Sequence, residues 1–223
     1  MSSTYRLSKE YPQVKEEKTN KSAVFIFNKY ASDYDLKFEP SASKTPLIDD
    51  FINRIPEYPL IVADIACGSG ILAHYIAQKK SNIKFVCIDG SKNMIEIASR
   101  KSIPGEFIHS LFPFHNLNEQ AHSMICSFLL NYLKADEIHP LIQYIVSNTS
   151  KSGFIYLSLY AAKENWYLKH TNEHKETLII YIPERNDFLE TLKKNELKVL
   201  HQFEKKSERF NELEELHLIL QST

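Results

Sequence analysis

The chain has 223 residues, which is the size of one ordinary domain with a substantial core. Its 27 basic and 28 acidic residues nearly cancel, so the overall charge gives no reason to expect a nucleic-acid partner. No apolar run approaches the roughly 20 residues of a membrane-spanning helix, and the N-terminus lacks an apolar signal segment. We therefore expect a soluble, cytoplasmic protein with no membrane partner.

The N-terminal part of the chain divides into two regions. Residues 1–21 mix Lys, Glu, Ser and Thr without lasting periodicity, which predicts a flexible arm or, alternatively, a mobile lid over a substrate. We expect residues 22–223 to form one domain that opens with two cap helices within residues 22–58. The first carries aromatic side chains over residues 23–34, and the second has an apolar face over residues 45–55.

From residue 60 onward, short apolar runs alternate with helical patterns. The expected strands cover residues 60–65, 83–88, 106–109, 122–128 and 153–160. The expected helices between them cover residues 70–80, 91–101 and 135–149. Because the apolar runs do not alternate strictly with polar residues, both faces of each strand should be covered. This pattern favours a parallel sheet with helices on either side.

The last part of the chain changes character. Residues 161–183 hold the only tryptophan, Trp166, and are interpreted as an insertion above the carboxyl ends of the strands. Open α/β sheets bind their ligands at that edge. A helix is expected over residues 185–194, and two closing strands over residues 197–203 and 215–220.

The chain has only five glycines, and two of them, Gly68 and Gly70, lie in the segment DIACGSG at residues 64–70. This segment follows the apolar residues 60–63 and precedes a predicted helix. A strand, a glycine-rich turn and a helix present backbone N–H groups and little side-chain bulk to a ligand. The pattern predicts a nucleotide-type cofactor site.

Two interpretations of this turn are open. Residues 68–73 satisfy the dinucleotide fingerprint with Ala in third place, and Asp89 follows at about the expected distance of 20 residues. That interpretation gives an NAD-binding oxidoreductase. The other begins at Asp64, since an acid before the loop suits a cationic ligand better than a pyrophosphate. The longer pattern resembles the first motif of the class I S-adenosylmethionine-dependent methyltransferases, and residues 89–94 (DGSKNM) resemble their second-strand motif.

The resemblance covers residues 20–160 well and the closing strands more loosely. It implies an α/β fold, namely a Rossmann-like, doubly wound, mostly parallel seven-stranded sheet with an antiparallel C-terminal hairpin. It also implies S-adenosyl-L-methionine as cofactor, with Asp89 bound to the ribose and Met94 covering the adenine. The residues expected to bind the cofactor are Tyr34, Asp64, Ala66, Gly68, Gly70, Asp89, Gly90, Met94, Ser110, Leu111 and Ser127.

The acceptor side is less well defined. Residues 127–132 resemble the family segment that faces the transferring methyl group, but Asn131 stands where some relatives carry His. No catalytic residue is therefore assigned. Aromatic walls suit a flat or partly apolar small molecule, although the same aromatics could simply pack as a small core. The candidate substrate residues are Tyr30, Asn131, Tyr132 and Trp166.

Departures from the family pattern leave a second alternative. The acid that often binds the adenine amino group is missing at Ser110, and His122 stands near the place of another family acid. A non-catalytic protein that binds adenosylmethionine would account for both. The scattered histidines and cysteines show no metal-binding spacing, so no metal is expected. The expected function is methyl transfer to an O or N atom of a small molecule by in-line displacement, with the oligomeric state open.

Overall fold

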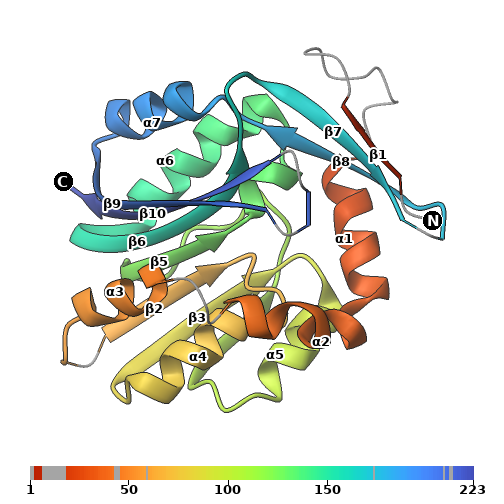
Figure 1. Ribbon diagram of the computed structural model, residues 1–223. Coiled ribbons are helices and arrows are strands. Elements are labelled where there is room, and N and C mark those ends of the chain that lie inside the picture. Colours follow the sequence, from red (N-terminus) through yellow and green to blue (C-terminus); the bar gives the residue numbers. More distant parts are fainter. Residues whose placement is uncertain are drawn as a thin grey trace.

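A computed structural model of the chain describes residues 3–6, 19–42, 46–58, 60–172, 174–207, 209–210 and 213–223. Most of the predicted N-terminal arm, residues 1–2 and 7–18, lies outside these ranges. Within the arm, β1 (Ser3–Arg6) is a strand. The described residues form a large sheet flanked by helices and a smaller sheet beside α1 (Figure 1).

The large sheet has seven strands in the order β4-β3-β2-β5-β6-β10-β9. Its strands are β2 (Leu60–Ile65), β3 (Ile83–Asp89), β4 (Gly105–His109), β5 (Ala121–Ser127), β6 (Thr149–Ala161), β9 (Leu197–Lys206) and β10 (Glu214–Ser222). The five strands from β2 to β6 pair in parallel, whereas β10 is antiparallel to both β6 and β9. The predicted Rossmann-like sheet with an antiparallel C-terminal hairpin is confirmed.

Helices cover both faces of this sheet. The helices on its faces are α3 (Pro46–Arg54), α4 (Ile71–Lys79), α5 (Lys92–Ser99), α6 (Ile138–Asn148) and α7 (Arg185–Lys194). The two N-terminal helices, α1 (Thr19–Lys29) and α2 (Ala31–Ala42), pack against α5. Two 3₁₀ turns, η1 (Leu129–Tyr132) and η2 (Ala135–Glu137), follow β5. Figure 1 shows α3, α4 and α5 on one face and α6 and α7 on the other. This two-sided cover explains why the strands read as apolar runs.

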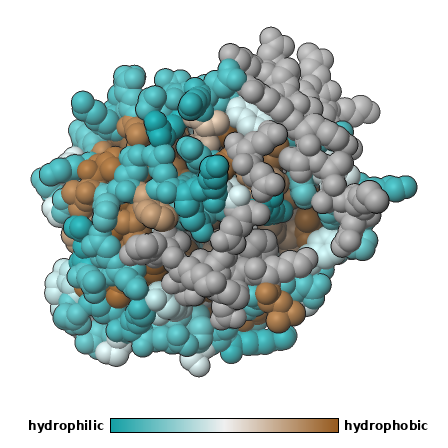
Figure 2. All heavy atoms as spheres, in the orientation of Figure 1, coloured by the Kyte–Doolittle hydropathy of each residue, from teal (hydrophilic) through white to brown (hydrophobic). Residues whose placement is uncertain are grey.

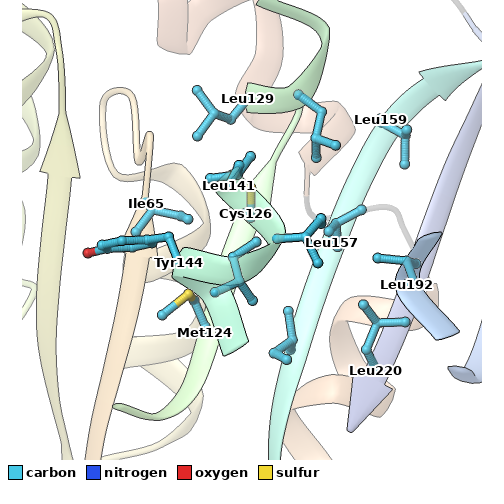
Figure 3. Close-up of a cluster of buried hydrophobic side chains, with 14 of the residues drawn as sticks. Ile65, Met124, Cys126, Leu129, Leu141, Tyr144, Leu157, Leu159, Leu192 and Leu220 are labelled. Carbon is cyan, nitrogen blue, oxygen red and sulfur yellow. The ribbon is translucent and has the colours of Figure 1, made fainter. Parts of the chain in front are cut away.

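Each face of the sheet has its own hydrophobic core. Figure 3 shows the first, in which Leu141 of α6 and Leu192 of α7 lie over Leu157 of β6. The second packs Phe51 of α3 against Tyr156 of the same strand. Successive strand residues point to opposite faces, so one apolar strand can supply both cores.

The segment expected as an insertion, residues 161–183, contains a β-hairpin. Its strands β7 (Trp166–Thr171) and β8 (Thr177–Ile182) are antiparallel, and β1 pairs with the free side of β7. Trp166, Leu168 and Ile180 pack in a third cluster with Ala23 of α1. The small sheet therefore supports α1 from outside.

Candidate active site

The loop between β2 and α4 curls tightly at three positions. Ala66, Gly68 and Gly70 have φ angles of 55°, 56° and 77°, in the left-handed region that favours glycine. At Gly70 an added Cβ would lie 2.9 Å from Cδ1 of Ile103, so packing as well as backbone conformation demands glycine. At Gly68 the nearest atom, Cε1 of Tyr34, would be an ordinary 3.9 Å away, and only the φ angle restricts the residue.

Asp89, the last residue of β3, joins this loop to the next one. Its Oδ2 accepts a hydrogen bond of 2.8 Å from the N–H of Gly68, and its Oδ1 accepts one of 2.7 Å from the N–H of Ser91. Burial raises the pKa of Asp89, while these two backbone hydrogen bonds oppose the rise. A carboxylate fixed in this way still has lone pairs for a bidentate bond to a ribose.

Asp64, in β2, is a buried carboxyl group with an unpaired oxygen. The side chain is 2% exposed, and Oδ2 has no hydrogen-bond partner among the described residues. Burial, reinforced by the charge of Asp89, raises the pKa of Asp64 to about 8. An unpaired acid at such a place favours a ligand that brings a cation or a donor to it.

Both N-terminal helices are anchored to these cofactor loops. In α1, Oδ1 of Asn28 accepts hydrogen bonds from the hydroxyl of Ser91 (3.1 Å) and the N–H of Asn93 (2.9 Å). In α2, Asp35 accepts a hydrogen bond from Ser69 in the glycine loop and pairs with Lys101 at 2.7 Å. The helices are thereby held over the carboxyl ends of the strands, toward which β2 and β5 point in Figure 1.

A cavity of about 400 Å³ lies between these helices and the strand ends, within the usual size of a ligand site. Its cofactor side is lined by Asp64, Gly68, Asp89, Gly90, Met94 and Leu111. The other side is lined mainly by aromatic and charged side chains, namely Phe27, Phe128, Tyr132, Tyr156, Tyr160, Lys205, Arg209, Glu215 and His217.

The structure brings together most of the residues that the sequence nominated for cofactor binding. Tyr34, Asp64, Ala66, Gly68, Asp89, Gly90, Met94, Leu111 and Ser127 all line the cavity. Gly70 lies behind the loop as the N-cap of α4, against Ile103. Ser110 lines a second, smaller hollow of about 270 Å³ together with Ile108 and is not among the residues that line the first cavity.

Of the candidate substrate residues, the structure places Tyr132 at the cavity. Asn131 is fully buried, where its amide donates to the carbonyls of Tyr160 (2.9 Å) and Tyr181 (2.8 Å). Trp166 is buried in the core beneath the small sheet. Tyr30 donates a 2.7 Å hydrogen bond to Glu176 at the outer end of α1. These three side chains make contacts within the region formed by α1, η1 and the small sheet, which we call the cap, and they do not line the cavity.

The polar residues on the acceptor side were not nominated from the sequence. Glu215 and His217 alternate with leucines in β10, so they point to the face opposite Leu216 and Leu218. Two ionisable residues spaced two apart among the leucines of β10 were the available signal. Their place beside Tyr156 becomes evident only once β10 pairs with β6.

Comparisons with known proteins agree with this geometry. Residues 62–153 match a family model described as a methyltransferase domain. A curated relative, the demethylmenaquinone methyltransferase of Thermotoga maritima, is 29% identical over 120 residues, covering 50% of this chain and 51% of the relative. The chain thus spans about half the length of that curated relative.

Solved methyltransferase structures share the fold. The magnesium protoporphyrin IX methyltransferase of Synechocystis PCC 6803, with bound S-adenosylmethionine, superposes with a TM-score of 0.69 at 14% identity, covering 94% of this chain and 99% of that one. The 1,6-didemethyltoxoflavin-N1-methyltransferase of Burkholderia thailandensis gives a TM-score of 0.68 at 10% identity, covering 99% of this chain and 95% of that one.

Sheet order, glycine turn and acid at the end of the second strand together define a Rossmann-like cofactor-binding domain of the methyltransferase class. In the sequence of residues 62–153 and in its fold, this chain is similar to the class I S-adenosylmethionine-dependent methyltransferases, the family that its motifs resemble. The two solved structures named above hold S-adenosylmethionine or S-adenosylhomocysteine, which favours that cofactor over NAD at the glycine turn.

Proposed function

We propose that the protein transfers the methyl group of S-adenosylmethionine to an O or N atom of a small molecule by in-line displacement. The observation that carries the proposal is a single cavity with two unlike sides. One side offers Asp64, Gly68 and Asp89, which suit the cofactor, and the other offers Tyr132 and Tyr160 as aromatic walls. A methyl group between the two sides would face the acceptor directly.

The cofactor side fits S-adenosylmethionine residue by residue. The unpaired Oδ2 of Asp64 suits the α-ammonium group, because a carboxylate attracts a cation strongly in a buried site. Asp89 suits the ribose hydroxyls, and the apolar side chains of Met94 and Leu111 suit the adenine. When bound, the cofactor supplies a methyl carbon already activated by a positive sulfur.

The chain's own contribution is alignment and exclusion of water. The helices α1 and α2 lie over the cavity, with Ala23, Val24, Phe27 and Tyr34 in its wall. Holding nucleophile, methyl and sulfur in line accounts for much of the rate enhancement that such a reaction needs. A small acceptor is favoured because the cavity lies beneath these helices, and the relatives named above act on small molecules. Among the described residues no helix is long and apolar enough to cross a membrane.

Calorimetry with S-adenosylhomocysteine, S-adenosylmethionine and NADH tests the cofactor, and mass spectrometry of reactions with small hydroxyl and amine compounds tests the transfer. The proposal requires binding of both adenosyl compounds and a mass gain of one methyl group on an acceptor. Heat with NADH alone would overturn it. Tight cofactor binding without transfer to any acceptor would instead favour the non-catalytic alternative.

A further inference from the structure

A chain of hydrogen-bonded polar groups lines the acceptor side of the cavity. The hydroxyl of Tyr156 in β6 lies 2.7 Å from Nδ1 of His217 in β10. The other ring nitrogen, Nε2, lies 3.4 Å from Oε2 of Glu215, and Nζ of Lys205 in β9 lies 3.3 Å from the same oxygen. All four residues border the cavity. Three strands therefore contribute to one polar cluster, the Tyr156–His217–Glu215 chain with Lys205 at its end.

The cluster is not explained by the fold. His217 and Glu215 are 3% and 8% exposed, and the next residue on the same face of β10 is the apolar Ile219. Burying ionisable groups costs free energy, and apolar residues of similar size usually serve stability as well or better. A buried ionic cluster at the wall of a ligand cavity is better explained by chemistry in that cavity.

The partners of the two ring nitrogens of His217 favour one arrangement of the protons. Burial pushes the pKa of Glu215 up, but the hydrogen bond from His217 and the charge of Lys205 outweigh it, so the pKa is lowered. An ionised Glu215 accepts from Nε2–H of His217. With Nε2–H donated to Glu215, Nδ1 is the ring nitrogen placed to accept a hydrogen bond from the Tyr156 hydroxyl. This arrangement allows the Tyr156 hydroxyl to pass its proton to Nδ1 of His217.

We propose that the Tyr156–His217–Glu215 chain takes up the proton of a hydroxyl acceptor, so that the methyl group is transferred to oxygen. The inference rests on the proposed function and names its acceptor class. The acceptor oxygen bonds to the methyl carbon while the carbon–sulfur bond breaks and its electron pair goes to sulfur. The acceptor proton passes to the Tyr156 oxygen, the Tyr156 proton passes to Nδ1, and Glu215 balances the imidazolium.

The groups around this chain suit a hydroxyl that becomes negative. Arg209 borders the cavity with its guanidinium 3.5 Å from the Tyr132 hydroxyl, and Lys205 stands beside Glu215. Burial raises the pKa of Tyr160, which keeps that phenol neutral. Another histidine, His201 of β9, lies opposite Ile219 of β10 and pairs with Asp50 of α3 on the protein surface. Two cations near the cavity favour the oxyanion, and general-base catalysis contributes about 10²–10⁴-fold to such reactions.

The test uses 4-nitrophenol, whose absorbance distinguishes phenol from phenolate, with the full chain saturated by S-adenosylhomocysteine. At a pH where the free probe is mostly protonated, the wild type should bind it as phenolate. His217→Asn and Tyr156→Phe should each lose the phenolate band while keeping the wild-type affinity for S-adenosylhomocysteine, which also verifies folding. His201→Asn, an exposed histidine of the neighbouring strand, is the matched control and should keep the band.

The outcomes separate the two proposals. A wild type that does not bind S-adenosylhomocysteine contradicts the proposed function itself. If that ligand binds but 4-nitrophenol does not, or binds as the neutral phenol, the proton-accepting chain is wrong and the methyltransferase assignment stands. A phenolate band that survives in both His217→Asn and Tyr156→Phe also overturns the chain, because the cations Arg209 and Lys205 would then suffice.

Discussion

At the scale of single residues, Asp64 and Asp89 show how neighbouring carboxyl groups acquire different properties. Asp89 accepts two backbone hydrogen bonds, whereas one oxygen of Asp64 has no partner among the described residues. The charge of Asp89 is one reason why the pKa of Asp64 is raised to about 8. Near neutral pH Asp64 is therefore largely protonated until a cation arrives, and binding of the cofactor's ammonium group should release a proton.

The raised pKa of Asp64 gives a stability prediction. The unfolded residue ionises near the ordinary aspartate pKa of 3.8, whereas the folded one ionises near 8, so the wild type loses stability progressively as pH rises between these values. Asp64→Asn removes this titration. Without ligand, it should exceed the wild type by more than about 1 kcal/mol at pH 8 and lose that advantage near pH 4. Urea unfolding at both pH values measures the difference, and an advantage that does not depend on pH would contradict the argument.

Asp89 gives a prediction about affinity. Asp89→Asn removes the charge and one acceptor oxygen from a side chain that holds Gly68, Ser91 and, by our proposal, the ribose. Calorimetry should show S-adenosylhomocysteine binding weakened by about 1.5–3 kcal/mol for each charge-assisted bond lost. Asp136→Asn, an exposed acid beyond β5, is the control and should bind as the wild type does. Equal affinity of Asp89→Asn and wild type would place the ribose elsewhere.

At the scale of elements, the sequence predicted what depends on local pattern. The strand and helix order over residues 60–160 and from residue 185 onward was recoverable because each buried element reads as its own apolar run, whereas β7 and β8 were not predicted within the expected insertion. The pairing of β1 with β7 was not, since it joins residues about 165 positions apart through backbone groups that carry no side-chain signature. Expected strands also differed at their ends, as β6 begins at Thr149 instead of residue 153.

The same distinction applies to the candidate site. The glycine turn and Asp89 could be predicted to lie together at the cavity because short contiguous motifs mark them. Asn131 was expected on the acceptor side, but the 3₁₀ turn η1 buries Asn131 and directs Tyr132 to the cavity. Sequence spacing alone does not show which residue of such a short turn faces the cavity. Glu215 and His217 needed the antiparallel return of β10 to reach the site.

Hydrogen bonds of Glu176 connect the end of α1 to the β7–β8 hairpin, and this connection gives a prediction at the scale of elements. It accepts hydrogen bonds from Lys29 (2.6 Å), Tyr30 (2.7 Å) and Asn172 (2.8 Å), which lower its pKa to about 2. Glu176→Gln should speed hydrogen exchange in α1 and weaken S-adenosylhomocysteine binding, since α1 lines the cavity.

The stabilisation that Glu176 gives to the cap depends on pH. Because its folded pKa is depressed, Glu176 stabilises the cap above its ordinary pKa of 4.5, and this contribution is lost as pH falls toward 2. The matched control is Glu190→Gln, which breaks an exposed ion pair with Lys194 on α7. If both variants exchange like the wild type in α1, the cap does not depend on Glu176.

At the scale of the whole molecule, the face of the protein shown in Figure 2 is mixed in character where its residues are described. Figure 2 shows hydrophilic residues over much of the visible face, with hydrophobic residues in separate patches. The 27 basic and 28 acidic residues leave a formal net charge of −1. Long-range electrostatics therefore offers little steering, and selectivity for ligands must come from the interior of the cavity.

The cavity wall draws on both ends of the chain, and this gives the last prediction. Val24 of α1 and Glu215 of β10 border the same space as Asp64 and Asp89. A ligand there links distant segments, so it should stabilise the domain as a unit. At a hundredfold excess over its dissociation constant, S-adenosylhomocysteine should raise the free energy of unfolding by about 2.7 kcal/mol. Hydrogen exchange should slow in both α1 and β10. Protection confined to the glycine loop, or stabilisation by NADH in place of S-adenosylhomocysteine, would contradict a shared cavity that serves this cofactor.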